Sequence, residues 1–226
     1  MSGPPIIVIS SSVPQVGKTT LALNLAAALW NDNYHVHLFS PNNHEVHNFI
    51  KMRKQFCQEH QIDLLMPTLL SGIKEADTFP DKSVIIADIP TSGASDYADI
   101  FAQAHTLISI GTNINHLQWE FNHPYMGLIW NAKKSIASRG IKYLNWIAVM
   151  NMSKTDETNI SKLSEMSRRF GYRVASPLKY REAFCHISRG YCAADMVRSP
   201  IFAMSMNDVY ARREILTLTD FLWQHK

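Results

Sequence analysis

The chain has 226 residues and a formal net charge of +3 at pH 7, and its residues are 46% hydrophobic and 18% charged. This composition is ordinary for a globular protein, so we expect one domain over residues 1–226 with a single large core. Three cysteines at no zinc-like spacing argue against a disulfide framework or a zinc site and favour a reducing, cytoplasmic location. We expect no signal peptide and no membrane insertion, because no apolar run approaches the ~20 residues that a membrane span needs.

Short apolar runs alternate with longer helix-like segments along the chain. The predicted strands are 6–10, 35–39, 84–88, 106–110 and 146–150. The predicted helices are 18–31, 44–60, 95–104, 118–138, 157–170 and 205–224. Most of these strands are apolar on both faces, as strands covered by helices on both sides should be. The alternation predicts the α/β class, with a doubly wound, mostly parallel sheet flanked by helices.

The segment SSVPQVGKTT, residues 11–20, lies between the first predicted strand and the first predicted helix. It fits the P-loop pattern G-x-x-x-x-G-K-[ST] except at its first position, where Ser12 replaces glycine. If that position needs a positive φ, the replacement costs about 1 kcal/mol. Backbone N–H groups and the helix dipole still favour a bound phosphate at the start of the helix. The candidate nucleotide-binding residues are Ser12, Pro14, Gln15, Val16, Gly17, Lys18, Thr19 and Thr20.

Three side chains carry the expected chemistry of this site. Lys18 is the candidate catalytic cation, because a lysine at this position reaches the β- and γ-phosphates, and the Thr19 hydroxyl is a candidate Mg²⁺ ligand. Strand 84–88 ends in Asp88, like a Walker B strand whose acid holds Mg²⁺ through water. The following loop, residues 89–93, is placed to sense the γ-phosphate. An aspartate there can also start a turn, but its pairing with the P-loop favours the metal site.

The order of these motifs carries a family resemblance. VGKTTLALNLAAAL followed by a strand, with Asp-x-Pro after a later strand, resembles the ParA/MinD group of P-loop ATPases with a deviant Walker A motif. WIAVMNMSKTDETNISKLSEMSRRFGYRVASPLKYREAF resembles the MipZ branch, in which a strand ends in an Asn-containing turn and a Gly-aromatic-Arg strand follows. The resemblance implies an ATPase that uses ATP and Mg²⁺, with Asn151 at the nucleotide.

The same resemblance implies partners and a cellular role. MipZ proteins dimerise, bind DNA non-specifically, interact with a ParB-type partner and restrain assembly of the division protein FtsZ. We therefore expect a role in division-site positioning or DNA partitioning, in the cytoplasm, where the nucleoid is a candidate site of association. Arg168, Arg169, Arg173, Lys179 and Arg181 match a region that carries DNA-contacting arginines in MipZ-like proteins. Phosphate contacts need only positive charge, so both DNA binding and a simple solvated helix face remain open for this cluster.

Two departures from the group bear on activity. Val13 stands where ParA/MinD members carry a lysine that reaches the partner's nucleotide, and Asn42 stands where they carry the aspartate that positions the attacking water. An amide orients water but cannot act as a general base. We expect nucleotide binding to survive, with Asn42 in the catalytic position, slow hydrolysis and a weakened homodimer.

Two other functions remain open. A dethiobiotin synthetase-like ligase shares V-G-K-T and the fold, but it carries a catalytic Lys-Pro where this chain has Ser40-Pro41. A scaffold that keeps the P-loop fold and a partner surface without binding nucleotide is the second alternative.

Overall fold

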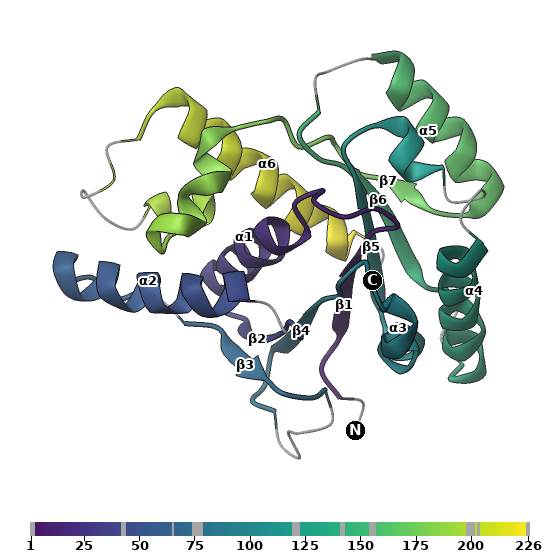
Figure 1. Ribbon diagram of the computed structural model, residues 1–226, viewed down its shortest axis with the longest axis horizontal. Helices are drawn as coiled ribbons and strands as arrows, with labels where there is room; N and C mark the ends of the chain where they lie inside the picture. The colour runs from purple at the N-terminus through teal and green to yellow at the C-terminus, as the bar shows by residue number, and fades with distance from the viewer. Residues whose placement is uncertain are drawn as a thin grey trace.

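Seven parallel strands form a single sheet in the computed structural model, in the order β3-β2-β4-β1-β5-β6-β7 (Figure 1). The structure describes residues 3–41, 44–64, 66–73, 79–118, 123–140, 143–153, 157–197, 202 and 204–224. The strands are β1 Ile6–Ser10, β2 His35–Phe39, β3 Thr68–Leu70, β4 Ser83–Asp88, β5 Thr106–Gly111, β6 Asn145–Met150 and β7 Arg173–Val174. The α/β class with a parallel, doubly wound sheet is therefore confirmed.

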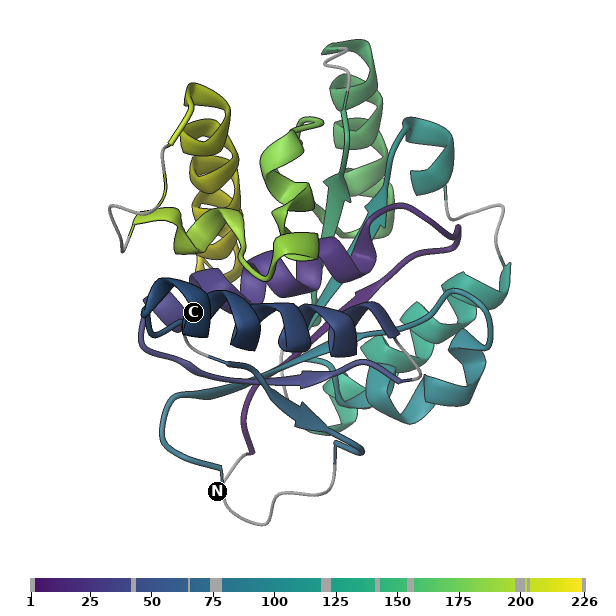
Figure 2. The same ribbon diagram turned by 60° about the vertical axis from the view of Figure 1, so that its left-hand side comes forward.

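Helices cover both faces of the sheet (Figures 1 and 2). The α-helices are α1 Lys18–Asn31, α2 His44–His60, α3 Ala98–Gln103, α4 His123–Ser138, α5 Glu157–Phe170 and α6 Met206–Trp223. Short 3-10 helices are η1 Ala94–Tyr97, η2 Ile114–Leu117, η4 Glu182–Arg189 and η5 Ala193–Val197. The predicted helix 95–104 is split into η1 and α3, and the predicted helix 118–138 is described as α4 from residue 123 onward.

The two apolar faces of the strands build two cores. Ile7 and Ile9 of β1 pack in a cluster with residues of α1, α2 and α6. Ile6 and Val8 of the same strand pack in a second cluster with residues of α3, α4 and α5. Because neighbouring strand residues point to opposite faces, a strand buried on both sides must be apolar throughout. This is the pattern from which the strands were predicted.

The topology places the carboxyl end of β1 at the centre of the sheet. From β1 the chain builds β2, β3 and β4 on one side and β5, β6 and β7 on the other. In open α/β sheets, ligands bind at the carboxyl ends of the strands where the strand order reverses. The loop after β1 and the end of β4 lie side by side there, since Ile9 pairs with Asp88.

A buried ion pair attaches the segment after β7 to α2. Arg53 donates to both carboxylate oxygens of Asp195, at 2.7 and 2.9 Å, and also to the Gly190 carbonyl at 3.2 Å. Gly190 has a φ of +87°, and a Cβ there would lie 2.6 Å from the Met52 carbonyl oxygen. Only glycine therefore fits where residue 190 passes the backbone of α2 at Met52. This close approach and the ion pair hold η4 and η5 against α1 and α2.

Among the described residues, no helix has both the length and the apolar character needed to cross a membrane.

Candidate nucleotide-binding site

The P-loop lies between β1 and α1, and it leaves the start of α1 open. Gly17 is the residue before the helix, with a φ of +85°, and no side chain caps the helix there. The first N–H groups of an uncapped helix are available to an anion. Ser12 is not among the residues with positive φ, so the penalty expected for its missing glycine does not arise; Gln15, at φ 57°, takes the left-handed conformation instead.

Lys18 contacts the loop that follows β4. Its Nζ donates to the Thr91 hydroxyl at 2.8 Å, and that hydroxyl donates in turn to the Val13 carbonyl at 3.1 Å. Burial lowers the pKa of Lys18, while the nearby carboxylates of Asp88 and Glu45 act in the opposite direction. A partly desolvated ammonium gains more from a phosphate than a solvated one does, because both charges are less screened.

Asp88 lies at the end of β4 and is hydrogen-bonded to the first turn of α1 and to the residue that follows β2. Its Oδ2 accepts hydrogen bonds from the Thr19 hydroxyl at 2.8 Å and from the Ser40 hydroxyl at 3.0 Å. One carboxylate and two hydroxyls form a hard oxygen donor set, of the kind that suits Mg²⁺ when substrate phosphates supply further ligands. Among the residues that the structure describes, no group of three His, Cys, Asp or Glu side chains could hold a metal by itself.

Asn151 supports the P-loop from the end of β6. Its Nδ2 donates to the Val16 carbonyl at 2.8 Å, and its backbone N–H donates to the Gly111 carbonyl at 2.7 Å. A Cβ on Gly17 would lie 2.5 Å from the same Nδ2, so the amide also requires glycine at that position. Asn151 is buried, and the described contacts give it a role in shaping the loop.

The remaining loop residues divide by exposure. Pro14 and Gln15 are exposed at the tip of the loop, and Val16 is buried in the core. Ser12 donates weakly to the His116 carbonyl at 3.4 Å, and Thr20 is half-buried in the first turn of α1. The candidate catalytic residue Asn42 lies outside the described residues.

Sequence reasoning missed two site residues. In the sequence, Ser40 served only to argue against the ligase, which has a lysine at this position. In the structure, the Ser40 hydroxyl donates a hydrogen bond to Asp88. Thr91 was included only as part of a loop, yet it is the residue that holds Lys18. The available signal was the position of their hydroxyl groups: Ser40 directly follows β2, and Thr91 lies three residues after Asp88 at the end of β4.

The five basic residues predicted to contact DNA do not form one cluster. Arg168 and Arg169 are exposed in the last turn of α5, before β7 begins. Arg173 pairs with Ile147 near the start of β6, whereas Lys179 pairs with Ser153 beyond its end. Because these pairings are parallel, Arg173 lies toward the amino-terminal end of β6, and Lys179 lies beyond its carboxyl end.

Two of the five are also held by contacts within the chain. The Arg173 guanidinium donates to Asn145 Oδ1 and to the Phe221 carbonyl, each at 3.1 Å. Arg181 forms an ion pair with Glu214 at 2.6 Å. Contact with DNA remains a prediction, for which Arg168, Arg169 and Lys179 are the exposed candidates.

Comparison with known families decides where the chain belongs. A sequence model of the family described as ATPase MipZ matches residues 85–223, more than half of the chain. The chain belongs to the MipZ family. The resemblance stated from the sequence is thus confirmed, and the matched region includes Asp88, Thr91 and Asn151 but not the P-loop. No curated protein matches the sequence.

Solved structures share the fold of this MipZ-family chain. The MinD cell division protein of Aquifex aeolicus is 14% identical, with a TM-score of 0.59 and 98% of each chain covered. A plasmid partition protein of Borrelia burgdorferi B31, bound to AMPPNP, is 14% identical, with a TM-score of 0.58 and 97% of this chain and 99% of that chain covered. Cobyrinic acid a,c-diamide synthase of Mycobacterium smegmatis, with an ATP analogue and magnesium, is 15% identical, with a TM-score of 0.53 and 86% and 94% covered. At these identities the likeness establishes the fold alone.

Proposed function

We propose that this MipZ-family protein binds ATP with Mg²⁺ at its P-loop and acts as a slow ATPase in division-site positioning or DNA partitioning. The observation that carries the proposal is the convergence of Lys18, Thr19 and Asp88 at the open start of α1. Bound nucleotides in structures of the same fold, with AMPPNP or with an ATP analogue and magnesium, support it. A cytoplasmic location and a ParB-type or FtsZ-type protein partner belong to the same proposal.

Each residue of the site has a part in holding the nucleotide. The first N–H groups of α1 would bind phosphate oxygens, and Lys18 would exchange the Thr91 hydroxyl for a phosphate. The Thr19 hydroxyl and Asp88 hold Mg²⁺, which neutralises phosphate charge when bound. Asn151 keeps the Val16 carbonyl fixed, so the loop does not have to be ordered by the ligand.

The surroundings of Val13 support slow hydrolysis and a weak dimer. Its side chain packs partly buried against the core, and its carbonyl accepts from Thr91. No cation is therefore offered to the nucleotide of a second copy from this position. With an amide at position 42 in place of a carboxylate, the attacking water also lacks a general base.

The contact of Ser40 favours the ATPase over the ligase. A dethiobiotin synthetase-like enzyme needs a lysine ammonium at this position, whereas here a neutral hydroxyl donates to Asp88 at 3.0 Å. With serine in place of lysine, this position cannot supply the catalytic ammonium of the ligase.

Phosphate release and sedimentation velocity, run together with ATP·Mg²⁺, test the proposed function. We expect release above the rate of Lys18→Ala, with most of the protein still monomeric. A tight ATP-dependent dimer with fast turnover would contradict the weakened activity. Absence of both nucleotide binding and phosphate release would leave the scaffold as the function.

A further inference from the structure

We propose that the first half of α6 is a docking surface for an acidic, amphipathic segment of a protein partner. Met206, Val209 and Tyr210 are 63%, 41% and 45% exposed, and we call these three residues the α6 apolar face. They are large apolar side chains that contribute little to the core. Contiguous apolar surface of this kind on a folded protein marks an interaction site.

Helical geometry separates the α6 apolar face from the side of the helix that the fold needs. Positions 206, 209, 210 and 213 follow the i, i+3, i+4, i+7 spacing of one face. The opposite face is buried in the core through Ala211, Ile215, Leu218 and Leu222. Farther along the exposed side, the residues are the polar Arg213, Thr217 and Asp220. The apolar residues are thus confined to the first turns, where folding does not require them.

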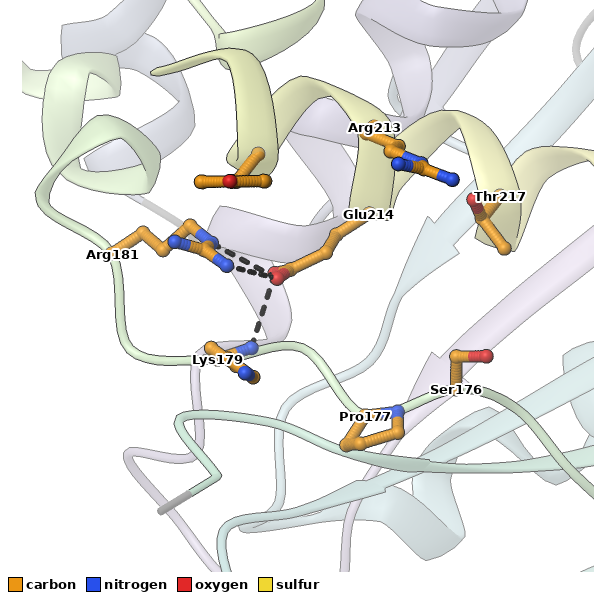
Figure 3. Close-up of a pocket in the computed structure, with 8 residues that line it drawn as sticks. Ser176, Pro177, Lys179, Arg181, Arg213, Glu214 and Thr217 are labelled. Carbon is orange, nitrogen blue, oxygen red and sulfur yellow. Dashed lines mark hydrogen bonds and ion pairs between the residues drawn. The ribbon is translucent and has the colours of Figure 1, made fainter. Parts of the chain in front are cut away.

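A pocket adjoins the α6 apolar face at Tyr210. This pocket of about 600 Å³ is lined by Ser176, Pro177, Lys179, Arg181, Tyr210, Arg213, Glu214 and Thr217 (Figure 3). Figure 3 shows Arg213 and Thr217 extending from α6 and Ser176 and Pro177 lying on the segment opposite. A second pocket, of about 370 Å³, lies near the start of α6 and is lined in part by Tyr191, Met204 and Asp208, none of which belongs to the α6 apolar face. A helix lying along α6 would therefore contact the α6 apolar face and, beside it, a pocket lined mainly by polar and charged side chains.

The charges around the larger pocket select an acidic partner. Glu214 neutralises Arg181 at 2.6 Å, and it also accepts the Lys179 backbone N–H at 3.1 Å. Within the part of the chain that the structure describes, the Lys179 ammonium and the Arg213 guanidinium form no hydrogen bond or ion pair. Both side chains are exposed. Two unpaired cations beside an apolar face complement a segment that alternates apolar anchors with carboxylates.

Other occupants fit this surface less well. Met206 and Val209 offer nothing to a nucleic acid backbone, and two unpaired cations provide few phosphate contacts. A second copy related by two-fold symmetry would bring the same positive groups toward each other, which costs free energy. Tyrosine, methionine and arginine are the residue types enriched at protein–protein interfaces. The surface therefore favours a protein partner, independently of whether the P-loop binds ATP.

Fluorescence anisotropy with a labelled synthetic peptide tests the inference. The probe is an amphipathic helix with leucines at i, i+3, i+4 and i+7 and glutamates elsewhere; a scrambled peptide of the same composition and a version with lysines for glutamates are controls. We expect the acidic helix to bind at least about tenfold more tightly than either control. Met206→Ser with Tyr210→Ser, and separately Arg213→Glu, should each weaken binding by about tenfold or more.

Matched variants on α4 control for general loss of apolar surface or charge. Trp130 is 49% exposed and Lys134 is exposed, so Trp130→Ser and Lys134→Glu should leave binding unchanged. Equal binding of the acidic and scrambled peptides, or equal loss in the α4 variants, would overturn the inference. A labelled DNA duplex whose binding falls in Arg213→Glu but not in Met206→Ser with Tyr210→Ser would assign the surface to DNA instead. A dimer in sedimentation equilibrium that the α6 double variant abolishes would assign it to a second copy.

Discussion

The Lys18 ammonium donates a hydrogen bond to the Thr91 hydroxyl at 2.8 Å. The same hydroxyl donates to the Val13 carbonyl, so Thr91 joins the candidate phosphate-binding lysine to the early part of the P-loop. A phosphate that binds Lys18 must share the lysine with Thr91 or displace it. We therefore expect the loop after β4 to respond when a nucleotide occupies the P-loop.

This competition predicts the effect of removing the Thr91 hydroxyl. In Thr91→Val, the Lys18 ammonium does not have to break a hydrogen bond to residue 91 before it binds a phosphate. ADP should therefore bind about threefold to tenfold more tightly, as expected for one hydrogen bond. Calorimetry measures the change. The neighbouring Ser92 is exposed and makes no hydrogen bond among the described residues, so Ser92→Ala is the matched control. Unchanged ADP affinity in Thr91→Val would mean that Lys18 does not have to leave Thr91.

The contact of Asn151 with Gly17 predicts a non-additive pair of substitutions. Gly17→Ala introduces a Cβ 2.5 Å from Asn151 Nδ2 at a φ of +85°, and it should lower the free energy of unfolding by about 2 kcal/mol or more. Asn151→Ala removes the donor to the Val16 carbonyl and should cost about 1–3 kcal/mol. In the double variant the Cβ of residue 17 no longer clashes with an amide at position 151. The loss of unfolding free energy in the double variant should therefore be smaller than the sum of the losses in the two single variants. Strict additivity in urea unfolding would refute the contact.

The start of α6 predicts a pH dependence. Burial alone would raise the pKa of Asp208, but hydrogen bonds from Ser205 and the nearby His186 outweigh it, so the pKa lies below the usual value. A depressed carboxyl pKa stabilises the fold above the unfolded value, about 3.9, and this stabilisation is lost as pH falls through the folded value. Asp208→Asn should therefore be less stable than the parent at pH 6, and the difference should shrink below pH ~4. A difference that stays constant across this range would contradict the shift.

The separation of the basic residues predicts how DNA binding depends on each group. If the exposed end of α5 contacts phosphates, charge reversal at Arg168 and Arg169 should weaken binding to any duplex and flatten its salt dependence. Arg173→Gln should act mainly on stability, because its guanidinium bonds Asn145 and the Phe221 carbonyl. Filter binding at several salt concentrations separates these effects. Full affinity in the Arg168 and Arg169 variant would exclude the end of α5.

Local sequence patterns predicted most of the fold. The strands with bounds 6–10 and 35–39 and the helices 18–31, 44–60 and 157–170 agree with the structure residue for residue. Their signal is local, since it is apolar residues on both faces of a strand or on one face of a helix. β3, with three residues, was not predicted because so short an edge strand has too little pattern.

Contacts between distant residues could not be read from such patterns. Ser40 and Asp88 are 48 residues apart, and Arg53 and Asp195 are 142 apart, so only the folded chain brings them together. The basic residues show that closeness in sequence does not guarantee closeness in space. They lie close in sequence, but β7 carries the chain along the sheet between Arg169 and Lys179 and separates them.

Calorimetric titration of the parent and of Lys18→Ala with ATP, in the presence and absence of Mg²⁺, tests most directly the claim that this P-loop binds nucleotide. The parent should bind ATP, and more tightly with Mg²⁺, because Thr19 and Asp88 then contribute to the metal site. Lys18→Ala should lose about tenfold or more in affinity, the value of a charge-assisted hydrogen bond. Equal ATP affinity in the two proteins would contradict the account of the site.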